Sequence, residues 1–223
     1  MSEALTLEQL DRDGAILDSV AELAGDTRAD FLRKAVVGGG AVVGGGALLG
    51  VLPGVAGAAV PKSDVAILNF ALTLEYLEAA FYTEAERNAS KFTPELARFA
   101  QVVGRHERAH VAFLKKALGR GAVKKPRFDF KGTTGESSKF AATAQTLEDT
   151  GVAAYLGQTP LIKSKKILAA AGSILPVEAR HAAWIRDIRG SGQAPTPAPT
   201  AFEGAKTKRQ ILAAVTGTGF IVG

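Results

Sequence analysis

The 223-residue chain contains no cysteine, and this absence removes several kinds of chemistry at once. Without thiols the protein cannot form disulfide bonds, thiolate metal sites or a cysteine nucleophile. Any metal ion must be held by oxygen and nitrogen ligands, and such ligands suit iron or manganese better than a structural zinc. Histidine is also scarce, because the chain has only three. Imidazole ligands can therefore number three at most.

Charge is distributed unevenly along the chain. Residues 1–59 hold 4 Lys or Arg against 8 Asp or Glu, whereas residues 60–223 hold 23 against 14. The later part therefore carries a net charge of about +9, which could attract phosphates or anionic surfaces. A basic surface on a soluble protein explains the same charge. We expect no nucleic-acid partner on this ground.

A glycine-rich apolar stretch occupies residues 35–60. It contains nine glycines and Pro53, a poor composition for a packed helix. Basic residues between positions 28 and 34 precede it and small residues close it, which is typical of an export signal. The string before it resembles a twin-arginine signal, with Ala29 where an arginine would stand. A retained membrane anchor is the alternative, because 26 weakly apolar residues could just span a bilayer. We predict that residues 1–62 form a leader with an export signal or anchor.

The predicted export signal also implies where in the cell the protein is located. An export signal would place the protein outside the cytoplasm, in the periplasm or another extracytoplasmic space. Contact with a membrane is expected only if the apolar segment is retained.

Helical spacing of hydrophobic residues predicts four long helices in the rest of the chain. Thr93 and Pro94 are typical of a helix start, since the threonine can cap and the proline fits the first turn. Gly119 is typical of a helix end. Ser63 or Asp64 is the expected N-cap of the first helix. The expected helices cover residues 63–89, 94–118, 138–156 and 163–189.

The segments between and after these helices complete the organisation. Residues 119–137 contain glycine, lysine and proline without a helical period, and their length allows a long crossover along a bundle. Pro176 lies inside the fourth helix and should bend it. The fold class is therefore predicted as all-α, an antiparallel four-helix bundle over residues 63–190 with a long crossover between helices 2 and 3. Residues 191–223 are expected to be a proline-rich linker and C-terminal tail.

Two copies of one pattern, about seventy residues apart, lie within the four predicted helices. Each copy has a glutamate, a tyrosine seven residues later, and a Glu-x-x-His sequence about thirty residues further on. Four carboxylates and two imidazoles on four helices are the ligands of a carboxylate-bridged dinuclear metal site. The first copy comprises Glu75, Tyr82, Glu107 and His110, and the second comprises Glu148, Tyr155, Glu178 and His181.

The spacing and the apolar surroundings support this interpretation. A glutamate and a histidine three residues apart lie on one face of a helix, and residues such as Phe99, Val103 and Trp184 turn those faces inward. Buried carboxylates are costly unless they are paired or coordinated. A single Glu-x-x-His is more often a surface pair. Two of the three histidines follow a glutamate at this spacing. In a random chain of the same composition, this would occur in roughly one case in a hundred.

Two polar residues near the motifs have no counterpart in the second copy. Glu78 corresponds to Gly151, so Glu75 is the expected ligand and Glu78 an auxiliary carboxylate or a group near the bundle rim. His106 corresponds to Val177 and is expected to be a partly buried or surface histidine outside the ligand set.

Tyr82 and Tyr155 lie two turns from the first glutamate of each copy. They are placed to hydrogen-bond a ligating carboxylate across the bundle, which would orient the ligand and tune the metal. Packing in the core is the alternative role for both.

The strings ILNFALTLEYLEAAFY, RHERAH, LEDTGVAAY and SILPVEARHAAW resemble the ferritin-like superfamily. They are most similar to bacterial ferritin-like domain proteins related to plant desiccation-related proteins. The resemblance covers about residues 63–190 and implies a ferritin-like bundle with two iron ions, or manganese in their place. It implies that the metal ligands are Glu75, Glu107, His110, Glu148, Glu178 and His181.

Three functions are compatible with these residues. The first is a di-iron protein of the ferroxidase type that oxidises Fe(II) with dioxygen or peroxide, in iron handling or stress protection. The second is a non-enzymatic desiccation or stress-protective bundle with weak or no metal binding. The third, a DNA-protecting mini-ferritin, is disfavoured because those proteins place metal sites between subunits and this chain carries a whole set. A homodimer is plausible for a bundle of this size.

Overall fold

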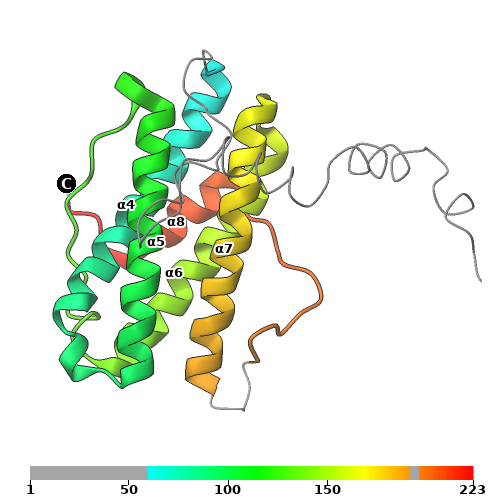
Figure 1. Ribbon diagram of the computed structural model, residues 1–223. Coiled ribbons are helices and arrows are strands. Elements are labelled where there is room, and N and C mark those ends of the chain that lie inside the picture. Colours follow the sequence, from blue (N-terminus) through cyan, green and yellow to red (C-terminus); the bar gives the residue numbers. More distant parts are fainter. Residues whose placement is uncertain (1–59, 191–195, 223) are drawn as a thin grey trace, which may run out of the picture. The chain divides into compact units, whose positions relative to one another are not determined.

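The computed structural model describes residues 60–190 and 196–222 (Figure 1). Within these residues the chain is helical, and the predicted all-α bundle is confirmed. Short 3-10 turns follow three of the helices at Ala89–Lys91, Gly119–Gly121 and Thr159–Leu161. The α-helices are α4 (Lys62–Arg87), α5 (Pro94–Leu118), α6 (Ser137–Gln158), α7 (Lys165–Gly190) and α8 (Lys208–Thr218).

Most of the predicted leader lies outside the described residues, because the description begins at residue 60. The predicted export signal or anchor therefore stays a prediction. The first part of the predicted linker, residues 191–195, also lies outside them.

The four long helices form two antiparallel pairs. α4 packs along α5, and α6 packs along α7. The pairs meet where α4 contacts α6 and α5 contacts α7, so neighbouring helices run in opposite directions (Figure 1). α7 continues through Pro176, as predicted for a proline inside the helix.

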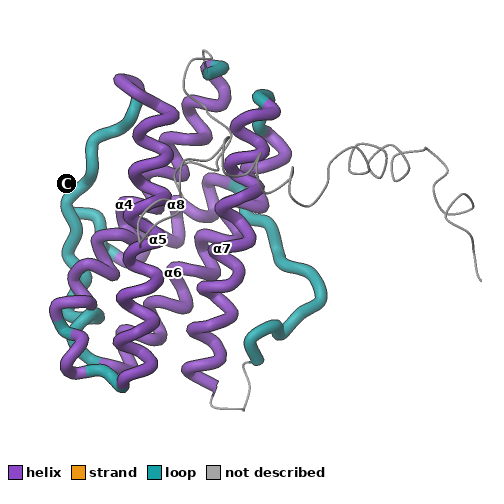
Figure 2. Tube along the Cα trace, viewed as in Figure 1, coloured by secondary structure: helices purple, strands orange, loops and turns teal. Residues whose placement is uncertain are grey.

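The connection between α5 and α6 runs the length of the bundle as a loop (Figure 2). It follows α4 closely. Asn69 near one end of α4 donates to the Gly121 carbonyl at 2.9 Å and accepts from the Val123 amide at 2.8 Å. Further along, the rings of Phe81 and Phe130 meet edge to face with centroids 5.3 Å apart. The long crossover predicted from the sequence is present and covers one side of α4.

Helix ends agree with the sequence signals in α5 and differ in α4. Thr93 caps α5 by accepting a hydrogen bond from the Leu96 amide. α4 instead begins at Lys62 after Pro61, so the expected cap at Ser63 or Asp64 is wrong. The buried Asp64 carboxylate accepts hydrogen bonds from the amides of residues 163 and 164, just before α7. Unpaired amides at a helix start need such acceptors, and this partner is 99 residues away in sequence.

α4 is, among the described helices, the one long and apolar enough to cross a membrane by length and composition. Most of its apolar window is buried between the other helices. The high mean hydropathy of α4 is therefore explained by its burial in the core of the bundle.

The C-terminal segment packs back onto α6. The Lys206 amide donates to the Ala153 carbonyl at 3.0 Å, and Ile211 and Val215 of α8 are buried in the main core cluster. A Cβ atom added at Gly157 would lie 1.9 Å from the Lys206 carbonyl oxygen. The close approach of the two segments therefore requires a glycine at position 157.

This contact predicts opposite effects for two helical glycines. Gly172→Ala places a Cβ in open space and should stabilise the fold by about 0.5–1 kcal/mol, because alanine has the higher helix propensity. Gly157→Ala should instead destabilise it by about 1–3 kcal/mol, since the C-terminal segment must move away. Urea denaturation measures both free energies of unfolding. Equal stabilisation by both substitutions would contradict the packing described.

Candidate metal centre

Most of the buried charged residues of the bundle gather around one point in its core. Each of the four long helices contributes to the cluster, and all its carboxylates are 1% exposed or less. The glutamates and histidines of the two Glu-x-x-His sequences come from α5 and α7, one helix turn apart in each case. The members are Glu75 from α4, Glu107 and His110 from α5, Glu148 from α6, and Glu178 and His181 from α7.

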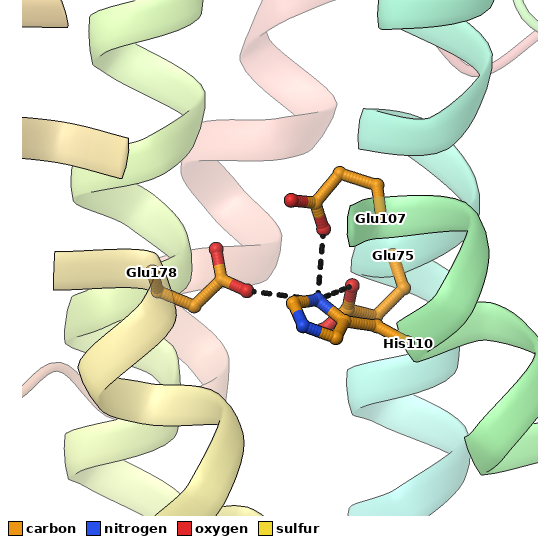
Figure 3. Close-up of side chains that lie close together, drawn as sticks. All are labelled: Glu75, Glu107, His110 and Glu178. Atoms are coloured by element: carbon orange, nitrogen blue, oxygen red, sulfur yellow. Dashed lines mark hydrogen bonds and ion pairs between the residues drawn. The ribbon is translucent and has the colours of Figure 1, made fainter. Parts of the chain in front are cut away.

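His110 is surrounded by three carboxylates (Figure 3). Its Nδ1 lies 3.2 Å from Glu75 Oε2 and 3.1 Å from Glu107 Oε2. Glu178 Oε1 lies 3.1 Å from the same nitrogen. One imidazole nitrogen and three carboxylate oxygens therefore converge from three helices.

His181 has the same kind of environment. Its Nδ1 lies 3.1 Å from Glu107 Oε1, 3.2 Å from Glu148 Oε2 and 3.8 Å from Glu178 Oε2. Glu107 and Glu178 belong to both groups, and each directs one oxygen toward each histidine. The structure thus contains two adjacent sets of four potential ligands that share two carboxylates.

Hydrogen bonds do not satisfy this cluster. Glu107 Oε1 and both oxygens of Glu178 are buried and accept no well-aligned hydrogen bond, although ring nitrogens lie close to them. Buried carboxylate oxygens without partners are strongly unfavourable. Three carboxylates and one imidazole around each of two points fit divalent cations of the iron or manganese type. The residues present can therefore hold metal ions.

Two tyrosines fix the outer glutamates by reciprocal hydrogen bonds. Tyr155 on α6 donates to Glu75 Oε1 on α4 at 2.5 Å. Tyr82 on α4 donates to Glu148 Oε1 on α6. Burial raises the pKa of both phenols well above the usual range, so both remain donors. Each phenol holds one carboxylate oxygen and leaves the other facing a histidine.

Without a metal ion, protons balance the negative charge. Burial alone would lower the pKa of His181, but the charge of Glu148 and the glutamate oxygens close to its Nδ1 raise it to about 12. Burial raises the pKa of Glu107 to about 8, and the charge of Glu178 adds to this effect. Burial likewise raises the pKa of Glu148 to about 7. A metal ion must therefore displace protons from this cluster.

Glu78 lies beside the cluster rather than at the rim. Its side chain is buried and faces Gly151, where an added Cβ would lie 3.3 Å from Glu78 Oε1. The same Cβ would lie 3.4 Å from Glu178 Oε2. Burial raises the pKa of Glu78 well above its usual range, and the charges of Glu178 and Glu148 add to the effect. Gly151 leaves room for this fifth carboxylate.

His106 contacts His181 across the bundle, and no sequence pattern predicted this contact. Its Nδ1 lies 2.9 Å from His181 Nε2, and the two rings stack with centroids 5.1 Å apart and planes at 17°. His106 is half-buried, in agreement with the prediction of a partly buried or surface histidine. Spacing along α5 could not reveal this contact, because it joins residues on different helices.

A family described as a ferritin-like domain matches residues 63–191. The match covers more than half of the chain and includes every residue of the cluster. No curated protein matches the chain.

The raised pKa values predict how the metal-free protein responds to pH. Glu107 and Glu148 keep protons up to about pH 8 and 7 in the folded state, whereas an unfolded chain loses them near the ordinary glutamate pKa of 4.5. The folded state therefore binds more protons between these values, and its stability falls as pH rises. In the presence of a chelator, we expect the melting temperature to fall by several degrees between pH 5 and 8.

Glu107→Gln provides the control, because an amide resembles the protonated carboxyl at every pH. This variant should show a smaller decrease over the same range. A melting temperature that rises with pH in the parent would contradict the assignment of protons.

Proposed function

This chain belongs to the ferritin-like domain family, and we propose that it binds two iron ions and oxidises Fe(II) with dioxygen or peroxide. The observation that carries the proposal is the pair of adjacent ligand sets that share Glu107 and Glu178. Shared carboxylates can hold two ions side by side, as a two-metal reaction requires. Manganese could replace one or both ions with the same ligands.

The two sets assign a role to each side chain. Glu75 and His110 would serve one ion only, Glu148 and His181 would serve the other, and the shared glutamates would bridge them. Iron bound there supplies electrons, since each Fe(II) that becomes Fe(III) passes one electron to the oxidant. Before an ion can bind, His110 and His181 must release the proton from Nδ1, the nitrogen that faces the carboxylates. Tyr82 and Tyr155 would hold the outer carboxylates in place during this exchange.

The size of the space near the cluster supports a small oxidant. An apolar hollow of about 20 Å³ between α4, α6 and α7 reaches Tyr155. This volume suits a molecule about the size of water. It favours dioxygen or peroxide as the second reactant over an organic substrate.

We further propose that this reaction serves iron handling or protection against oxidative or dehydration stress outside the cytoplasm. The support is the basic and apolar pattern of residues 1–62, with its small-residue ending. A protein that folds before export could load its metal inside the cell.

Anaerobic titration of the metal-free chain with Fe(II), followed by exposure to oxygen, tests the proposal. We expect two iron ions per chain and the appearance of ferric absorption when oxygen is added. Glu107→Gln and Glu178→Gln should each lose most of this iron binding, because each variant removes a carboxylate shared by both sets. Glu95→Gln, an exposed change on α5, should behave as the parent.

Binding of less than one iron per chain, with no change in thermal stability, would overturn the proposal. That result would favour the alternative, a non-enzymatic protective bundle.

A further inference from the structure

The internal repeat allows the two halves of the cluster to be compared position by position. Glu75, Tyr82, Glu107 and His110 each have a counterpart in the second copy. Two polar neighbours have no polar counterpart, because Gly151 is the residue that corresponds to Glu78 and Val177 is the residue that corresponds to His106. The two halves of the site are therefore chemically different.

His106 contacts only one of the two cluster histidines. His181 presents Nδ1 to the carboxylates, so its Nε2 is the outer nitrogen, and this atom lies 2.9 Å from His106 Nδ1. When Nδ1 of His181 holds a metal ion, Nε2 carries the proton and must donate it. His106 Nδ1 is the acceptor. Within residues 60–190 and 196–222, His110 Nε2 makes no such hydrogen bond to a side chain.

Such a contact strengthens a metal ligand. A hydrogen bond from the outer nitrogen fixes the tautomer and the ring orientation of a ligating histidine, and it raises the basicity of the nitrogen on the metal. The stacked ring of His106 also limits rotation of His181. Valine at position 177 can do neither for His110.

Glu78 adds a buried carboxyl group to the same half. A Cβ atom added at Gly151 would lie 3.3 Å from Glu78 Oε1 and 3.4 Å from Glu178 Oε2. This oxygen of Glu178 is the one that faces His181. The Glu78 carboxyl group has no counterpart beside the other half, because Gly151 carries no side chain.

Resting on the metal binding proposed above, we propose that the two metal positions are unequal. The position formed with Glu148 and His181 binds its ion first and more tightly. His106 is the positioning residue that sets this preference through His181.

Calorimetric titration of the metal-free full chain with Co(II), a probe ion that tests binding without iron oxidation, examines this inference. The parent should bind two ions in steps of different affinity. Glu148→Gln should lose the tighter step, whereas Glu75→Gln should lose the weaker step and keep one tightly bound ion. These two variants remove equivalent carboxylates from the two halves, so each is the matched control of the other.

The role of His106 is tested by three further variants. His106→Val, which copies the residue of the second half, should weaken the tighter step about tenfold and leave the weaker step unchanged. His106→Gln should restore the affinity, because its amide oxygen can accept the same hydrogen bond. Arg105→Val, a change on the exposed neighbouring residue, should bind as the parent.

Equal loss from Glu148→Gln and Glu75→Gln would overturn the inference, as would His106→Val weakening both steps alike or His106→Gln failing to restore binding. A parent that binds two Co(II) ions with one affinity overturns the inequality alone. A parent that binds none overturns the proposed function as well. Unchanged circular dichroism and metal-free melting temperatures of the variants would show that they fold.

Discussion

Repulsion between carboxylates buried in one small volume is the constraint on which the rest of the bundle depends. Glu75, Glu107, Glu148 and Glu178 are all inaccessible to water, and ionised groups in such a place are unfavourable unless cations lie between them. Without a metal ion, two imidazoles, two phenols and the protons retained by Glu107 and Glu148 reduce this repulsion. Three carboxylate oxygens still lack aligned donors. The core is therefore arranged for positive charge as much as for apolar packing.

The cluster also links the folding of the two helix pairs. The α4–α5 pair and the α6–α7 pair are each local in sequence, and each supplies one Glu-x-x-His sequence. Neither pair contains a complete ligand set, because each set needs a shared glutamate from both pairs. The reciprocal hydrogen bonds of Tyr82 and Tyr155 also cross between the pairs. Docking of the pairs and assembly of the centre are thus the same event.

Features of the structure that depend on residues close in sequence could be predicted from the sequence. Thr93 and Gly119 act within one helix turn, and their sequence signals gave the ends of α5. The doubled motif gave the residues that gather in the core, since helical spacing places each Glu-x-x-His on one face. Other contacts between distant segments had no such signal. The capping of α7 by Asp64 and the close approach of Lys206 to Gly157 each join distant segments, and sequence spacing does not encode them.

The crossover and α8 cover the α4 and α6 side of the bundle. The crossover follows α4, and α8 packs on α6 with Lys208 over the ring of Phe70 of α4. On the other side, the α5 imidazole His110 retains 12% of its side-chain exposure, and His106 beside it is half-buried. An ion that arrives on that side would meet the imidazoles before the buried carboxylates. The side that the crossover and α8 leave uncovered is therefore the side on which the histidines lie nearest to solvent.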